Sequence, residues 1–125
     1  MNEYIMPLEA KVNGKNISFR SPPARRLSET LREELHLTGT KVGCDAGDCG
    51  ACTVLIDGDP VCACLTPLAQ TTGRQITTIE GVNNGHGLNA LQAAFLRHGA
   101  AQCGICTPGM LMAAKSLVDS NLNPS

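Results

Sequence analysis

The first part of the chain alternates apolar and polar positions in two short runs. Residues 8–12 and 17–19 show this alternation on either side of Asn13-Gly14. A period of two is typical of a half-buried strand, in which successive side chains point to opposite faces. Asn-Gly favours a tight hairpin turn because both residues tolerate positive φ. The sequence therefore predicts a β-hairpin over residues 8–20.

The spacing of apolar residues becomes helical after Ser21-Pro22-Pro23. Leu27, Leu31 and Leu35 fall at i, i+4 and i+8, which places them on one face of a helix. Gly39 is a plausible end for this helix, since glycine adopts the left-handed conformation that closes many helices.

Three further short runs are rich in β-branched and apolar residues, at 53–57, 61–65 and 75–79. The turn residues 57–60 join the first two runs into a second hairpin. Two hairpins with a helix between them predict a small mixed sheet packed on a helix.

The pattern changes at residues 83–87, which read as a linker, and only helical signals follow. One amphipathic stretch runs from Leu88 to Gly99. A second begins at Thr107-Pro108, where an N-cap residue precedes a proline at the first helical position. We therefore expect an α+β chain in which a small sheet is followed by a linker and then by helices.

Composition narrows the function classes. Of 125 residues, 42% are hydrophobic and 17% are charged, as in a folded protein. The net charge of −1 leaves no basic excess to neutralise phosphates, so we expect no nucleic-acid partner. No apolar run approaches the roughly 18 residues of a membrane span. The N-terminus lacks the pattern of a secretory signal, from which we expect a cytoplasmic protein.

Candidate chemistry comes from the seven cysteines, three of which lie in a glycine-rich stretch without periodicity. Cys44-x4-Cys49-x2-Cys52, followed by a distant cysteine, is the plant-type [2Fe–2S] spacing. Each iron of a binuclear cluster needs two thiolates, so one loop can supply three and the fourth must come from elsewhere. Spacing leaves two candidates for the fourth, Cys62 and Cys64, because residues two apart on the predicted strand face the same side.

Three glycines flank these cysteines, Gly43, Gly47 and Gly50. We expect them to allow positive φ and a close approach of backbone N–H groups to the cluster. Zinc sites favour closely paired Cys-x2-Cys ligands, so the four-residue spacing makes zinc the weaker interpretation. Incidental structural cysteines are as weak an interpretation as zinc, because three cysteines at this spacing rarely arise by accident.

A second pair, Cys103 and Cys106, directly precedes the helix start at Thr107. The partial positive charge of a helix N-terminus lowers thiol pKa values and suits thiolate ligands. Two cysteines supply only half of a cluster site.

Together these segments resemble the small iron–sulfur subunit of the molybdenum hydroxylases, the xanthine dehydrogenase and aldehyde oxidase family. The resemblance covers nearly the whole chain. Its motifs are the approach to the first cysteine (37–44), the cluster loop (48–54), Cys64-Leu65-Thr66, the segment 77–81 and the second cysteine motif (102–109).

The resemblance implies two domains, a β-grasp, ferredoxin-like domain over 1–82 and an incomplete helical-bundle domain over 83–125, each holding a [2Fe–2S] cluster. It makes Cys64 the better fourth ligand and assigns Gln102 a hydrogen bond to the pterin of a partner. The chain would be a non-catalytic electron-transfer subunit of an oxidoreductase, with molybdopterin on a large subunit and FAD on another. No residue here would be catalytic, and substrate choice would belong to the molybdenum subunit.

Family members have a further cysteine pair beyond the equivalent of residues 121–124, which would complete the second site. Three explanations stay open: the chain is a fragment, another chain supplies the missing half, or only the first cluster is held. Two other functions also stay open, a free one-cluster ferredoxin and a metal-binding module without redox turnover. Cys103 and Cys106 argue against the free ferredoxin, which would not need them.

Overall fold

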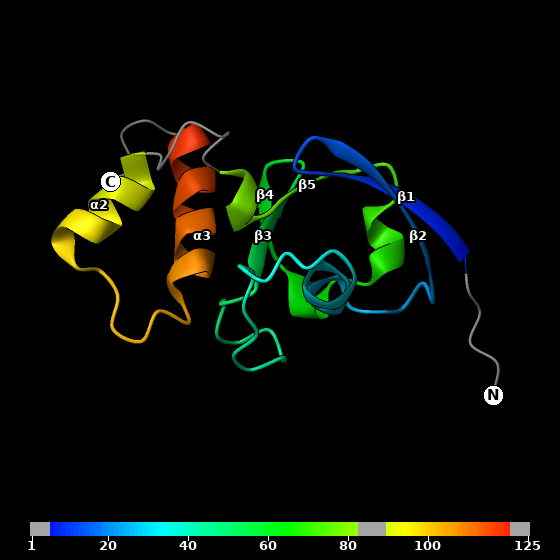
Figure 1. Cartoon of the computed structure of the whole chain (residues 1–125), viewed down its shortest axis with the longest axis horizontal. Coiled ribbons are helices and arrows are strands. Elements are labelled where there is room, and N and C mark those ends of the chain that lie inside the picture. Colours follow the sequence, from blue (N-terminus) through cyan, green and yellow to red (C-terminus); the bar gives the residue numbers. More distant parts are fainter. Residues whose placement is uncertain (1–5, 83–89, 121–125) are drawn as a thin grey trace.

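Five strands form one mixed sheet in the computed structural model, which describes residues 6–82 and 90–120 (Figure 1). The strand order across the sheet is β2-β1-β5-β3-β4. The strands are β1 (Met6–Val12), β2 (Lys15–Ser21), β3 (Thr53–Ile56), β4 (Asp59–Cys62) and β5 (Gln75–Thr77). Strand β5 runs parallel to β1 and antiparallel to β3, which makes the sheet mixed. The expected α+β architecture, a small mixed sheet followed by helices, is confirmed.

The predicted N-terminal hairpin is present and extends by one or two residues at each end. Val12 pairs with Lys15 across the turn, and Asn13 and Gly14 both have positive φ, at 51° and 83°. The alternating residues of β1 face the core, since Leu8, Ala10 and Val12 are at most 5% exposed.

The helix after the prolines is shorter than predicted. It consists of α1 (Leu27–Glu29) and a π-helical turn η1 (Thr30–Glu34), and it ends near Leu35 rather than at Gly39. His36 takes the left-handed conformation there, with φ of 58°. Leu37, which lies beyond this turn, then packs back against the core that Leu27 and Leu31 occupy.

The predicted strand over 61–65 is wrong in its second half. Strand β4 ends at Cys62, and the 3₁₀ turn η2 (Ala63–Leu65) follows it. Cys62 and Cys64 therefore do not lie on one strand, and the period of two does not relate their side chains. Two further 3₁₀ turns, η3 (Leu68–Thr71) and η4 (Ile79–Gly81), flank β5. The strand predicted to reach Ile79 thus ends at Thr77.

Both predicted C-terminal helices form, α2 (Ala90–His98) and α3 (Thr107–Ser120). Gly99 closes α2 with φ of 61°. Helix α3 lies along β3 (Figure 1), where the fully buried Met112 packs with Leu55 and Val82. The proposed linker 83–87 and Leu88 lie outside the described residues, and the domain division at residues 82 and 83 stays a prediction.

No helix among the described residues is long and apolar enough to cross a membrane.

Candidate metal centre

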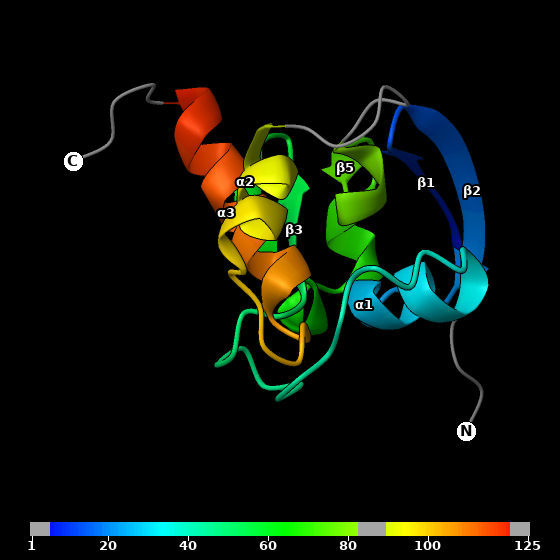
Figure 2. The same ribbon diagram turned by 60° about the vertical axis from the view of Figure 1, so that its left-hand side comes forward.

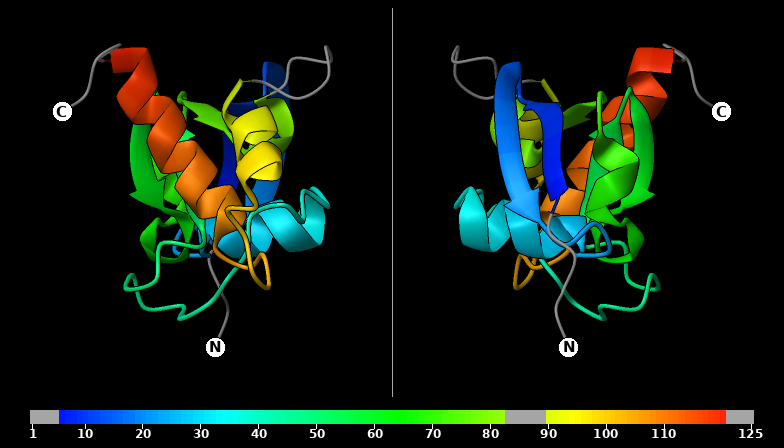
Figure 3. Two further views of the ribbon diagram at one scale, coloured as in Figure 1. Left: turned by 90° about the vertical axis from the view of Figure 1, so that its left-hand side faces the viewer. Right: turned by 90° about the vertical axis from the view of Figure 1, so that its right-hand side faces the viewer.

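Two cysteine-bearing segments lie at the same end of the molecule. The cluster loop, residues 43–52, leads into β3, and residues 99–106 connect α2 to α3. Figures 1 and 2 show both at the end opposite the tip of the β1–β2 hairpin, and Figure 3 shows them from two further sides.

The exposed thiol of Cys44 is surrounded by backbone donors. The N–H groups of Ala46, Asp48 and Cys49 donate to Cys44 Sγ at 3.3, 3.1 and 3.2 Å. These hydrogen bonds, that from Cys49 foremost, lower the pKa of Cys44 from an ordinary 9.0 to about 7. The loop therefore stabilises the thiolate, the form in which cysteine binds a metal.

Cys52 and Cys64 meet beneath the loop. Both are 2% exposed, and the N–H of Cys64 donates to Cys52 Sγ at 3.4 Å. Burial, and then contact with the Cys52 thiol, raise the pKa of Cys64 to about 11. Cys62 is half-buried at the end of β4, where it pairs with Thr53 in the sheet. The structure thus places Cys64 directly against a loop cysteine.

The glycines of the loop serve two different purposes. Gly47 and Gly50 have positive φ, at 82° and 74°, as expected. Gly43 does not, and the prediction of positive φ is wrong for this residue. Gly43 is instead a place of close approach, because a Cβ there would lie 2.8 Å from Cys49 Sγ. Asp45 takes the third left-handed position of the loop, with φ of 55°.

This set of donors fits an anionic binuclear cluster. Thiols from the loop and from η2 are combined with N–H groups aimed at sulfur, including that of Ala51, which donates to Cys49 Sγ at 3.4 Å. Such N–H groups stabilise negative charge on thiolates. Among the described residues, no three His, Cys, Asp or Glu side chains surround a point where a single metal ion could bind. The ligands of a binuclear cluster surround two irons and two sulfides instead.

The approach to the loop is held by residues that sequence reasoning missed. Arg32 Nη1 donates to the carbonyls of Thr38 and Thr40 at 2.8 and 2.9 Å. The N–H of Gly39 donates to Glu80 Oε2 at 2.7 Å. Only the folded chain brings Glu80 to this segment, 41 residues away in sequence.

The second pair precedes α3, and both of its thiols are exposed. Gly104, between them, has φ of 89°, and the N–H of Met110 donates to the Cys106 carbonyl at 3.0 Å to close the first helical turn. One residue beyond Cys106, Thr107 Oγ1 is buried and has no hydrogen-bond partner among the described residues. Gln102 lies exposed on the same segment.

The two cysteine segments touch through Gly109. A Cβ at Gly109 would collide with the Gly50 carbonyl and lie 3.0 Å from Ala51 Cα. The first turn of α3 therefore packs on the backbone between Cys49 and Cys52. Sequence reasoning missed this contact, although a glycine in a first helical turn, where it weakens the helix, was a usable signal.

Comparison with known proteins agrees with both halves of the chain. Residues 10–77 match the family described as 2Fe-2S iron-sulfur cluster binding domain, and residues 78–125 match the family described as [2Fe-2S] binding domain.

Relatives of known name are similar over nearly the full chain. The nicotinate dehydrogenase small FeS subunit of Eubacterium barkeri is 44% identical over 100% of this chain and 78% of its own length. The aldehyde oxidoreductase iron-sulfur-binding subunit PaoA of Escherichia coli is 48% identical over 91% of this chain. The chain spans half of the length of that subunit.

A solved structure is similar in both sequence and fold. It is quinoline 2-oxidoreductase from Pseudomonas putida 86, with a TM-score of 0.92 and 50% identity. The match covers 97% of this chain and 75% of that chain.

Proposed function

The chain belongs to the [2Fe–2S] iron–sulfur subunits of the molybdenum hydroxylase family, and from this we propose that it is the electron-transfer subunit of a molybdopterin-dependent hydroxylase. The observation that carries the proposal is the gathering of Cys64 against the cluster loop. A [2Fe–2S] cluster would supply one-electron transfer there.

We assign the first cluster to Cys44, Cys49, Cys52 and Cys64. The protein favours the thiolate form at one of these cysteines and the protonated thiol at another. Backbone N–H groups already favour the thiolate at Cys44, whereas the buried Cys64 must give up its proton when iron binds, because its pKa is raised. Gly43 allows the close approach of the backbone to Cys49 Sγ, and Gly47 and Gly50 supply positive φ in the loop.

Cys103 and Cys106 form half of a second cluster site in this proposal, within a helical domain over 83–125. The other two ligands would come either from a continuation of the chain or from another chain. Thr107 Oγ1, beside Cys106, supports this: it is buried and has no hydrogen-bond partner within residues 6–82 and 90–120, whereas buried hydroxyl groups normally have one.

The partner we propose is a large molybdopterin-binding subunit, with Gln102 hydrogen-bonding the pterin, and beyond it an FAD-binding subunit. The helices support a large contact. Helix α2 has no buried residue, and five apolar side chains of this region are exposed: Leu96, Ile105, Met110, Leu117 and Val118. Several exposed apolar side chains in one region favour a contact with another protein. We place the assembly in the cytoplasm, where thiols stay reduced and available as ligands.

The test is iron and acid-labile sulfide analysis of the complete gene product, purified anaerobically with its accompanying subunits, together with EPR after dithionite reduction. Three forms are compared: the unaltered protein, Cys64→Ser and the matched control Cys62→Ser. The two cysteines are two residues apart, and the N–H of Cys64 donates to Cys52 Sγ.

We expect two distinct [2Fe–2S] signals in the unaltered protein and in Cys62→Ser, with one signal lost in Cys64→Ser. A double variant Cys103→Ser/Cys106→Ser should lose the other signal and keep the first. Colourless protein with zinc would overturn the proposal, and a single signal indifferent to Cys103 and Cys106 would favour a free one-cluster carrier.

A further inference from the structure

The backbone at Arg26 is fastened to the segment that follows Cys64. Arg26 forms an isolated antiparallel bridge with Pro67. On either side of it, the N–H of Leu27 donates to the Thr66 carbonyl at 2.9 Å and the N–H of Leu68 donates to the Arg25 carbonyl at 2.8 Å. Leu27 and Leu68 are fully buried, so this junction is fixed in the core.

The side chain of Arg26 reaches the cluster loop and does not fold back onto the helix that follows it in the chain. Its Nη1 forms an ion pair with the carboxylate of Asp45 and donates to the Asp45 carbonyl at 3.4 Å. Asp45 directly follows Cys44 and is one of the three loop residues with positive φ. One arginine thus connects the segment of Cys64 with the residue beside Cys44.

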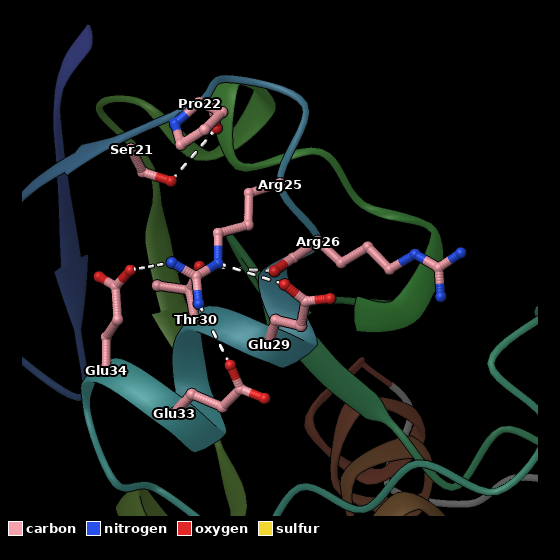
Figure 4. A network of polar contacts seen from close by, with 8 residues as sticks. All are labelled: Ser21, Pro22, Arg25, Arg26, Glu29, Thr30, Glu33 and Glu34. Carbon is pink, nitrogen blue, oxygen red and sulfur yellow. Dashed lines mark hydrogen bonds and ion pairs between the residues drawn. The ribbon is translucent and has the colours of Figure 1, made fainter. Parts of the chain in front are cut away.

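The adjacent arginine does something different. Arg25 forms ion pairs with three carboxylates on the far side of the helix, those of Glu29, Glu33 and Glu34. Figure 4 shows the two arginines leaving the backbone in different directions, with Arg26 pointing away from this acidic group. Arg25 is therefore a matched control, because it is the neighbouring arginine and its ion pairs are with residues of the helix.

We propose that Arg26 is a positioning residue for the [2Fe–2S] cluster of the loop: it clamps Asp45 so that Cys44 and Cys64 keep their relative places, and its positive charge favours the reduced cluster. The inference rests on the proposed function, because it requires a cluster in the loop.

The mechanical part of this role is the same for both residues, whereas the effect of their charges on the reduction potential is opposite. Removal of either Arg26 or Asp45 breaks the clamp and loosens the loop. Loss of the arginine, however, leaves an unpaired negative charge beside Cys44, which opposes the extra electron of the reduced cluster. Loss of the aspartate charge leaves an unpaired positive charge, which favours that electron. A purely mechanical role would not produce opposite effects on the reduction potential.

The experiment compares Arg26→Gln, Asp45→Asn, their combination and the control Arg25→Gln in the complete protein with its accompanying subunits. Two quantities are measured, the rate of iron loss to a chelator and the midpoint potential of the loop cluster by EPR-monitored titration. Both side chains are about half exposed, with side-chain exposures of 45% and 50%. An ion pair of this kind is worth up to about 1 kcal/mol, so we expect iron loss to accelerate by roughly 2- to 5-fold in each single variant.

The midpoint potential should fall in Arg26→Gln, rise in Asp45→Asn and return near its original value in the double variant, which still loses iron quickly. Arg25→Gln should change neither quantity. The inference is overturned if both single variants shift the potential in the same direction, if neither shifts it, or if Arg25→Gln matches Arg26→Gln. A complete protein without any loop-cluster signal would overturn the proposed function itself, whereas a normal signal with unaffected variants overturns only the role of Arg26.

Discussion

The contact between α3 and the cluster loop predicts an unusual outcome for Gly109→Ala. In most helices this change is stabilising by up to about 1 kcal/mol, because glycine is a poor helix former. Here the new Cβ would lie 3.0 and 3.1 Å from Ala51 Cα and C, and closer still to the Gly50 carbonyl oxygen. These are backbone atoms, which cannot rotate aside as a side chain can.

The magnitude follows from these distances. Carbon atoms prefer separations of about 3.5 to 4.0 Å, so the first turn of α3 must move outward by roughly 0.5 to 1 Å. Overpacking of this kind costs about 1 to 3 kcal/mol. After the gain in helix propensity is subtracted, the upper part of this range leaves a net loss of about 1 to 2 kcal/mol for the docking of α3. The contact therefore outweighs propensity.

Hydrogen–deuterium exchange reports this directly, because the Met110 N–H is bonded to the Cys106 carbonyl in the displaced turn. A loss of about 1 to 2 kcal/mol corresponds to exchange that is roughly 5- to 30-fold faster when exchange follows local opening. Met110→Ala is the control, since this neighbouring side chain is 43% exposed and its removal should change little. Unchanged or slower exchange in Gly109→Ala would refute the close contact.

Two further predictions follow from burial and from the loop hydrogen bonds. Met112→Ala should destabilise the packing of α3 by about 2 to 5 kcal/mol, because Met112 is fully buried and packs with Leu55 and Val82. Proteolysis at α3 should accelerate, and an unchanged rate would contradict the assigned packing. In protein stripped of metal, alkylation of Cys44 by iodoacetamide, followed by peptide mass mapping, should rise with a midpoint near pH 7, because the lowered pKa of about 7 populates the thiolate above that pH; a midpoint near the ordinary 9.0 would show that the N–H groups do not act on Cys44.

The secondary structure was predictable where local pattern and local chemistry agree. The Asn13-Gly14 hairpin and the two C-terminal helices are examples, because turn residues and apolar periodicity act over a few positions. The strand predicted over 61–65 is wrong for a tertiary reason. Cys64 has to turn inward toward Cys52, and a strand continued past Cys62 would not bring it there.

The candidate site, too, could be predicted from the sequence only in part. The cysteine spacing and the glycines are visible in the sequence because one short loop supplies three ligands of the cluster. Spacing alone left Cys62 and Cys64 equivalent, and only the resemblance to a known family favoured Cys64. The structure adds a physical reason, burial together with a backbone N–H donated to Cys52.

The sequence by itself determined the chemical type of the centre, since three of the four assigned cysteines and the glycines lie within one loop. Only the tertiary structure decided what surrounds the centre. It brings together the ion pair of Arg26 with Asp45, the hydrogen bond from the Gly39 N–H to Glu80 and the close contact of Gly109 with the loop backbone. Each of these contacts joins residues between 19 and about 59 positions apart, as the sequence numbers show. Contacts at such separations are set by the packing of the sheet and helices, and no local pattern encodes them.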